Sequence, residues 1–175
     1  KVQKSRPQTY QAEVPISHEV ETDRFVLSIS GRMDGIYSQP DRIIIEEIKT
    51  TSRAPEHFVQ HEEPLHWGQV KTYAYMYAAQ HELDEIDAQL LYYQIESGRI
   101  QEIKRSFAFP ELEAFVTHLA KHYLDWADKI VNWSDVRRSS IQALDFAYSA
   151  SRPEQSAMAV AVYRAIKNEG QILIQ

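Results

Sequence analysis

Two carboxylates and a lysine occur in the sequence at spacings that could bring them to one point. Glu47 and Lys49 lie two residues apart in an apolar stretch, residues 42–50, that we predict to be a strand. Side chains alternate between the faces of a strand, so both should point the same way. With Asp34 on the neighbouring strand, the group could bind Mg²⁺ through two carboxylates, the main-chain carbonyl of Ile48 and waters. Lys49 could then orient the nucleophile in metal-assisted hydrolysis of a phosphodiester.

A second polar pair lies on a predicted helix, residues 64–81, which a proline begins. Gln69 and Tyr73 are one turn apart, so they share a helical face and could contact a substrate or position the preceding β-strand. His66 lies one turn before Gln69 and could contact the substrate. Tyrosines at every second position from Tyr73 to Tyr77 could stack on bases. Because this spacing cannot keep all three on one face, we expect Tyr77 to lie in the core.

Each of these features also has an ordinary structural explanation. A glutamate and a lysine two residues apart are a common charge pattern on a solvated sheet face. Asp34 could be a turn aspartate beside a glycine, and the helical pair could be a polar flank with one half-buried aromatic ring. His61, Glu62 and His66 could be interpreted as a metal cluster. Their spacing fits no standard site, which favours a flexible acidic loop.

Taken in order, the aspartate that closely follows a glycine, the E-x-K pair and the Q-x-x-x-Y pair resemble the PD-(D/E)xK nuclease superfamily, most closely its RecB-like exonuclease branch. The resemblance covers residues 10–109 and rests on five positions: Asp34, Glu47, Lys49, Gln69 and Tyr73. It implies that the two carboxylates bind Mg²⁺ or Mn²⁺, that the lysine is catalytic, and that the helical pair is accessory. It also implies a restriction-endonuclease-like fold and a DNA substrate. The upstream helix of that family is not recognisable before Tyr10.

Composition excludes several other kinds of protein. The chain has 175 residues, of which 43% are hydrophobic and 25% charged, as expected for a folded domain. It has no cysteine, which excludes disulfides, thiolate zinc sites, an iron–sulfur cluster and a cysteine nucleophile within it. The formal net charge of -6 argues against coating nucleic acid by bulk electrostatics, although a local basic surface stays open. No apolar run is long enough to span a membrane, so we expect a cytoplasmic protein without membrane contact.

The order of predicted elements, β-β-β-α-β-β and then helices, indicates an α/β (α+β) fold with a mixed central β-sheet flanked by α-helices. The isoleucine run at residues 43–45 exceeds what a surface strand needs, so we place that strand in the middle of the sheet. A polar loop, residues 51–63, precedes the first helix. The predicted strands are residues 10–17, 24–32, 42–50, 88–96 and 99–109. The predicted helices are residues 64–81, a long helix from Pro110 through Ile130, and a further helix from Ser134 toward Phe146.

The last part of the sequence differs from the rest, so we predict a nuclease domain at residues 1–147 and a second segment at 148–175. That segment has Arg152-Pro153-x-Gln155, an amphipathic helix over residues 154–167, a break at Gly170 and an apolar strand over residues 172–174. It resembles the entry into the motor of DinG/XPD-type superfamily 2 helicases; a capping helix with a terminal strand is the alternative. No Gly-x-x-x-x-Gly-Lys-Ser/Thr is present. We expect a piece of a longer helicase polypeptide, cut just before its phosphate-binding loop.

Together these features predict a Mg²⁺- or Mn²⁺-dependent DNA nuclease. We expect an exonuclease that is the N-terminal module of a DNA-repair or recombination helicase. One alternative is a catalytically silent nucleic-acid-binding module that guides a strand to the helicase motor. Another is a structural domain with a fortuitous motif. The intact set of two carboxylates and a lysine favours the enzyme.

Overall fold

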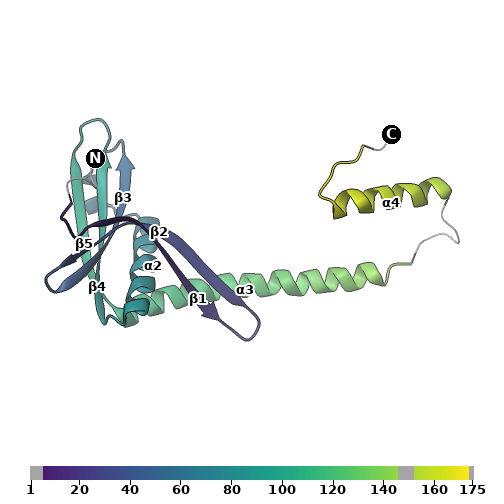
Figure 1. Cartoon of the computed structure of the whole chain (residues 1–175), viewed down its shortest axis with the longest axis horizontal. Helices are drawn as coiled ribbons and strands as arrows, with labels where there is room; N and C mark the ends of the chain where they lie inside the picture. The colour runs from purple at the N-terminus through teal and green to yellow at the C-terminus, as the bar shows by residue number, and fades with distance from the viewer. Residues whose placement is uncertain (1–5, 146–151, 174–175) are drawn as a thin grey trace. The chain divides into compact units, whose positions relative to one another are not determined.

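A five-stranded β-sheet organises the first part of the chain (Figure 1). The computed structural model describes residues 6–145 and 152–173. The chain divides into two units, residues 1–129 and 130–175. The strands are β1 (Gln11–Glu21), β2 (Val26–Gln39), β3 (Arg42–Thr51), β4 (Glu85–Gln94) and β5 (Ile100–Ala108). The helices are α1 (His57–Gln60), α2 (Pro64–His81), α3 (Phe109–Gln142) and α4 (Pro153–Lys167).

The strands lie side by side in chain order, and each neighbouring pair is antiparallel except β3 and β4. A parallel pair needs a crossover connection between its strands, and α2 lies in that connection. α2 contacts β1 to β4 on one side of the sheet, which we call the helix face (Figure 1). The other side is the back face. The predicted fold class, a mixed sheet flanked by helices in the order β-β-β-α-β-β, is confirmed.

β3 is buried on both of its sides. Ile45 belongs to the core cluster beneath α2 on the helix face, and Ile44 points to the back face; both are 0% exposed. The predicted central position of this strand is therefore confirmed. The core on the helix face consists of apolar side chains from the sheet, from α2 and from the first turns of α3, among them Met33, Ile45, Val70, Ala74, Met76, Leu90, Leu112 and Val116.

The strands differ from the predicted ranges mainly at their ends. β1 continues to Glu21 because it pairs with β2 up to that residue, and β2 continues to Gln39 because its last residues pair with the start of β3. Pro40 and Asp41 form the turn between β2 and β3. β4 begins at Glu85, three residues earlier than predicted. The ladder with β5 begins there, so hydrogen bonding to a neighbouring strand overrides the polar character of these residues.

The helices bring two corrections. The polar loop predicted at residues 51–63 contains α1, whose Phe58 is buried. The helix predicted to start at Ser134 is wrong, because α3 runs without a break from Phe109 to Gln142. No glycine or proline occurs between residues 111 and 142 to interrupt it. Phe146, where we expected a helix to end, lies outside the described residues.

In the second unit, α4 confirms the predicted amphipathic helix, with its start one residue earlier at Pro153. The main-chain N–H of Arg152 donates a 3.0 Å hydrogen bond to Gln155 Oε1, which caps the helix. The predicted terminal strand is wrong over its two described residues, Ile172 and Leu173, which form no strand; Ile174 lies outside the described residues. A strand needs a neighbour to supply its hydrogen bonds, and the described ladders join only β1 to β5.

None of the helices in the described part of the chain is long and apolar enough to cross a membrane.

Candidate active site

The predicted site lies at a fork in the sheet. The ladder between β2 and β3 runs from the Gln39–Arg42 pair to the Gly35–Glu46 pair and ends there. Beyond this point β2 stays paired with β1, whereas β3 stays paired with β4. The two strands thus part at the position that carries the predicted carboxylates.

Asp34 joins the two strands at this fork. Its Oδ2 accepts a 2.7 Å hydrogen bond from the main-chain N–H of Ile48. A main-chain donor that faces the fork is thereby satisfied by a side chain instead of a ladder partner. The bond fixes the Asp34 carboxylate against the strand that carries Glu47 and Lys49.

Lys49 connects β3 with α2. Its Nζ donates a 2.6 Å hydrogen bond to Glu47 Oε1 and a 2.7 Å hydrogen bond to Gln69 Oε1. Gln69 Nε2 in turn lies 3.4 Å from the hydroxyl of Tyr73, to which it donates. The Tyr73 ring lies so close to Gly31 that a Cβ there would come within 2.6 Å of it. The structure therefore brings the E-x-K pair and the Q-x-x-x-Y pair into one chain of hydrogen bonds.

Glu47 is a buried carboxylate with one unsatisfied oxygen. The residue is 3% exposed, and its Oε2 has no hydrogen-bond partner among the described residues. Burial raises the pKa of Glu47; the Lys49 hydrogen bond opposes this, and the charge of Asp34 adds to it, so the net direction is upward. An unsatisfied buried charged oxygen is costly. A cation between the two carboxylates would remove that cost.

The donor set fits a hard divalent cation. Two carboxylates, from Asp34 and Glu47, lie near one another, and Mg²⁺ commonly takes one or two carboxylates and keeps several waters. In the described part of the chain no three His, Cys, Asp or Glu side chains gather as a metal site. The structure does not test the predicted contribution of the Ile48 carbonyl.

The alternative histidine cluster is not formed. His61 stacks on His57 with ring centroids 4.6 Å apart, and Glu62 forms an ion pair with Arg105. His66 turns instead toward the sheet, where its Nδ1 lies 3.0 Å from the Tyr92 hydroxyl. The three side chains thus have separate partners.

His66 nevertheless belongs to the surroundings of the site. Burial lowers its pKa, the charge of Lys49 lowers it further, and Glu63 opposes both. Its partner Tyr92 stacks on Phe58 of α1, with ring centroids 4.0 Å apart. Sequence reasoning missed this arrangement; its only signal was a lone phenylalanine in a polar loop.

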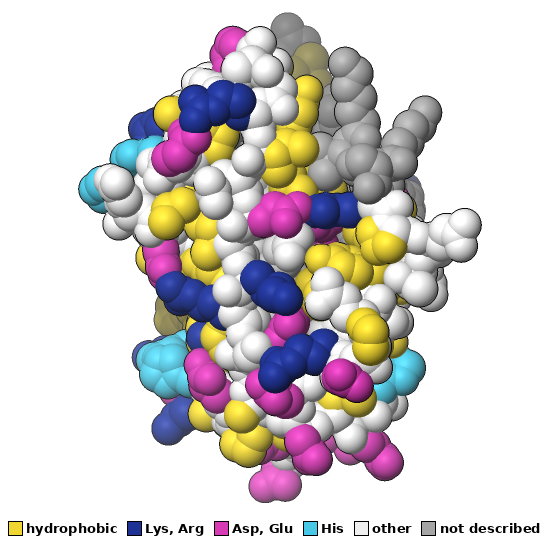
Figure 2. All heavy atoms as spheres, turned by 90° about the vertical axis from the view of Figure 1, so that its left-hand side faces the viewer, with side chains coloured by type: hydrophobic (Ala, Val, Ile, Leu, Met, Phe, Trp, Pro, Cys, Tyr) yellow, Lys and Arg dark blue, Asp and Glu magenta, His cyan; other side chains and the backbone are white. Residues whose placement is uncertain are grey.

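Charges of both signs are mixed on the surface. Figure 2 shows Lys and Arg side chains interleaved with Asp and Glu on one face of the molecule. Ion pairs of exposed residues, such as Arg42 with Glu85 and Arg99 with Glu56, follow the same pattern. The face in view offers no continuous basic patch for nucleic acid.

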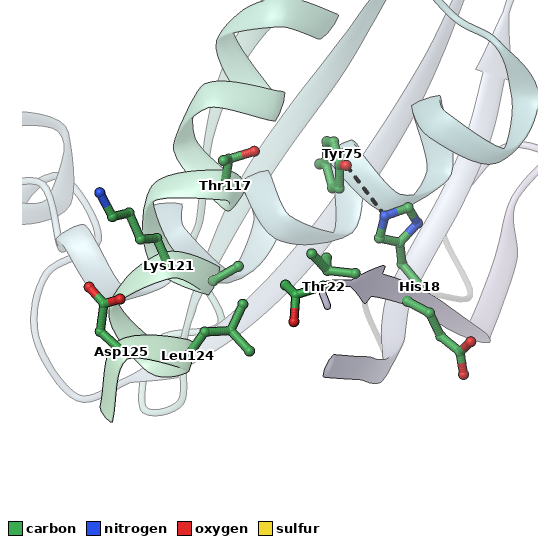
Figure 3. A pocket seen from close by; sticks show the side chains of 10 residues that line it. His18, Thr22, Tyr75, Thr117, Lys121, Leu124 and Asp125 are labelled. Carbon is green, nitrogen blue, oxygen red and sulfur yellow. Dashed lines mark hydrogen bonds between the residues drawn. The ribbon is translucent and has the colours of Figure 1, made fainter. Parts of the chain in front are cut away.

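A separate hollow of about 500 Å³ lies between β1, α2 and α3. Figure 3 shows His18 pointing to Tyr75, whose hydroxyl lies 3.3 Å from His18 Nε2, with Lys121 and Asp125 on the opposite wall. None of the predicted site residues lines this hollow.

Residues 2–151 match the PD-(D/E)XK nuclease superfamily, and the chain belongs to that superfamily. Its members are usually nucleases, which are hydrolases, and typically use divalent metal ions such as Mg²⁺. Among the solved structures that match is the crystal structure of SSO0001, at 24% identity and a TM-score of 0.46. The match covers 67% of this chain and 50% of that one, so the chain spans half the length of SSO0001. This likeness is too loose to bear on the site. A search of the curated proteins finds no match.

Proposed function

We propose that the chain is a Mg²⁺- or Mn²⁺-dependent DNA exonuclease of the RecB-like branch, with its active site at the fork between β2 and β3. The observation that carries this proposal is the buried, unsatisfied Oε2 of Glu47 beside Asp34. A carboxylate in that state destabilises the fold unless a ligand completes it. Its position on the E-x-K strand of a nuclease superfamily makes a catalytic cation the ligand of choice.

In this proposal Asp34 and Glu47 are the metal ligands. The bound cation would polarise the scissile phosphate and favour attack by water. Lys49 orients the nucleophile and balances negative charge, because its ammonium is already held beside Glu47. Gln69 fixes the direction of that ammonium, and Tyr73 fixes Gln69.

His66 is proposed to contact the substrate. Burial lowers the pKa of His66 and the charge of Lys49 lowers it further, which favours the neutral imidazole. A neutral imidazole can donate one hydrogen bond to a phosphate oxygen without competing for the metal site. The interaction with Tyr92 fixes the orientation of the ring.

A catalytically silent module that guides a DNA strand is the second candidate. The buried, unsatisfied Oε2 of Glu47 beside Lys49 favours the enzyme, because guiding a strand requires no incomplete carboxylate at this position. A structural domain would likewise have no use for that oxygen. The proposed cation site accounts for it.

Cleavage of end-labelled linear DNA, circular single-stranded DNA and RNA, with Mn²⁺, Mg²⁺ or a chelator, tests the proposal. We expect metal-dependent loss of linear DNA and survival of the circles. Lys49→Ala should abolish cleavage while Mn²⁺ binding persists, and Lys121→Ala, on the wall of the separate hollow, should cleave as the wild type does. Cut circles would overturn the exonuclease assignment, and cleavage of RNA alone would overturn the DNA assignment. Absence of any metal-dependent cleavage would overturn the function.

We further propose that a helicase motor follows the nuclease domain in the same polypeptide, with the domain boundary near residues 147 and 148. Arg152-Pro153-x-Gln155 at the start of α4 supports this, although Gln155 also has a purely structural use as a helix cap. The gene sequence after Gln175 tests it. A Gly-Lys-Ser/Thr loop within about a dozen residues is expected, and its absence would remove the helicase while leaving the nuclease.

A further inference from the structure

A network of polar side chains lies on the back face, directly behind the candidate active site. Glu46 is 0% exposed and is bound at both oxygens by the guanidinium of Arg6. Gln89 Nε2 donates a 2.9 Å hydrogen bond to Glu46 Oε2. The Tyr10 hydroxyl lies 2.9 Å from Glu46 Oε1. All four hydrogen bonds that this carboxylate accepts thus come from residues that are far from it in the sequence.

The backbone at Asp34 is irregular. In the described ladders β1 and β2 pair at Ala12–Gly35 and at Val14–Met33, and the position between them is skipped. Opposite Asp34, Glu13 has a φ of 58°, a left-handed conformation unusual for a strand residue. The regular pairing that would hold Asp34 in place is therefore interrupted.

The same irregularity changes the direction of the side chains. Met33 and Ile36 are three residues apart, so a regular strand would put them on opposite faces. Both lie in the core cluster of the helix face. Between them, Asp34 is directed to the Ile48 amide, and Gly35 faces the back. The orientation of the Asp34 carboxylate thus depends on a local departure from regular strand geometry.

The Tyr10 hydroxyl contacts this irregular segment. It lies 3.2 Å from the main-chain oxygen of Asp34, so its proton is shared between that oxygen and Glu46. Tyr10 reaches this position because residue 35 is glycine: a Cβ at Gly35 would collide with the Tyr10 hydroxyl. Tyr10 therefore joins β2 to β3 on the back face, opposite the Asp34 to Ile48 bond.

We propose that Tyr10 is a positioning residue for the active site. It fixes the main chain at Asp34 and thereby the orientation of the Asp34 carboxylate. Arg6 and Glu46 anchor the Tyr10 hydroxyl from behind. This inference rests on the proposed function, since it deepens the role of the same metal site. Groups that orient metal ligands without touching the metal typically change metal affinity or activity about 10- to 100-fold when removed.

Tyr10→Phe removes the hydroxyl and keeps the ring, which packs on Tyr37 with centroids 5.9 Å apart. Tyr37→Phe is the matched control. It removes a hydroxyl from the same network, where Tyr37 donates a 3.3 Å hydrogen bond to Gln89 Oε1, at a residue that pairs with Ile44 and not at the fork. A merely structural loss would affect both variants alike.

Two measurements test the proposal. The first is hydrogen exchange of the Ile48 amide by NMR in metal-free protein, where we expect exchange at least about 10-fold faster in Tyr10→Phe than in Tyr37→Phe or wild type. The second is a Mn²⁺ titration by electron paramagnetic resonance, where we expect about 10-fold weaker binding in Tyr10→Phe only. Unchanged exchange and Mn²⁺ affinity in Tyr10→Phe would overturn the inference. Faster Ile48 exchange with no Mn²⁺ binding in the wild type would overturn the proposed function and leave Tyr10 as a structural support of Asp34.

Discussion

Two neighbouring glutamates on β3 differ in how fully their carboxylates are hydrogen-bonded on the two faces of the sheet. On the back face, both oxygens of Glu46 accept hydrogen bonds, from Arg6, Tyr10 and Gln89. On the helix face, Glu47 is almost as deeply buried, yet only its Oε1 is satisfied and its Oε2 has no partner among the described residues. The residues are adjacent in sequence and identical in chemistry, so the difference comes from the surroundings alone.

We interpret that difference as the one between a structural carboxylate, Glu46, and the proposed metal-binding carboxylate, Glu47. Burial of a charge is tolerable when every lone pair has a partner, and removing a partner is then strongly destabilising. A carboxylate that is buried and left incomplete lowers stability, and such groups concentrate where a ligand or substrate completes them. The network behind β3 stabilises the strand on which the incomplete carboxylate sits.

Glu47→Gln should have the largest effect, on cleavage. Loss of one of the two proposed carboxylate ligands would remove several kcal/mol of transition-state stabilisation, which corresponds to a rate at least about 1000-fold lower. The free energy of unfolding should stay within about 1 kcal/mol of the wild type or rise, because the variant no longer buries an incomplete charge. Single-turnover cleavage with Mn²⁺ and urea unfolding of metal-free protein measure the two quantities. A variant that unfolds much more easily would make Glu47 a structural residue like Glu46.

Glu46→Gln, the same change one residue earlier, should show the reverse ranking. The amide cannot accept all the bonds that the carboxylate accepts, and Arg6 loses the buried half of its ion pair, whose side chains are 14% and 0% exposed. We expect a loss of about 3 kcal/mol in the free energy of unfolding. Cleavage, measured at a temperature where the variant is fully folded, should fall much less than in Glu47→Gln. Equal stability of Glu46→Gln and wild type would contradict the contrast between the two faces.

The arrangement of side chains on the helix face could be predicted from the sequence, because each pair involved is close together in the chain. The period of two placed Glu47 and Lys49 on one side of a strand, and the helical turn placed Gln69 beside Tyr73. The structure links these four side chains through successive hydrogen bonds. Their catalytic roles stay predictions.

The hydrogen-bond network on the back face could not be predicted, because its members are far apart in the sequence. Arg6 lies 40 residues before Glu46, and no periodicity connects them. Nor could the spacing show that Asp34 lies in an interrupted ladder, although Gly35 marks a position of close approach. The prediction of a helix start at Ser134 was wrong because serine, a common capping residue, also occurs inside helices, and α3 continues through it.

Asp87 extends the back-face pattern and gives it a pH dependence. Its side chain is 2% exposed; burial raises its pKa, but Ser106, Arg42 and Lys104 lower it more, so the net direction is downward. A lowered native pKa means that the contribution to stability is present above the unfolded pKa of about 4 and is lost as the pH falls through the native pKa. Asp87→Asn should therefore lower the free energy of unfolding by about 1.5 kcal/mol at pH 7 and by progressively less below pH 4.

Urea unfolding of wild type and Asp87→Asn at pH 7, 5, 4 and 3 measures this difference. Other groups that titrate in acid affect both proteins, so the difference isolates Asp87. A gap that stays constant over this pH range would mean that Asp87 is held by packing and not by its charge.

Tyr73→Phe should have the smallest effect and decides how far the helix-face site extends. The Tyr73 hydroxyl accepts a long, 3.4 Å hydrogen bond from Gln69, while its ring packs over Gly31. Phenylalanine keeps the ring, so the free energy of unfolding should change by less than about 1 kcal/mol. Gln69 would lose the contact that fixes its amide, and Lys49 would be less well aimed at Glu47. We expect cleavage to fall about 3- to 10-fold, measured beside Tyr77→Phe, whose ring stacks on His81 near the end of the same helix.

Equal cleavage by the two variants would confine the site to Asp34, Glu47, Lys49 and Gln69. A large loss of stability in Tyr73→Phe alone would instead place its hydroxyl in the core, where removing it leaves a buried partner unsatisfied.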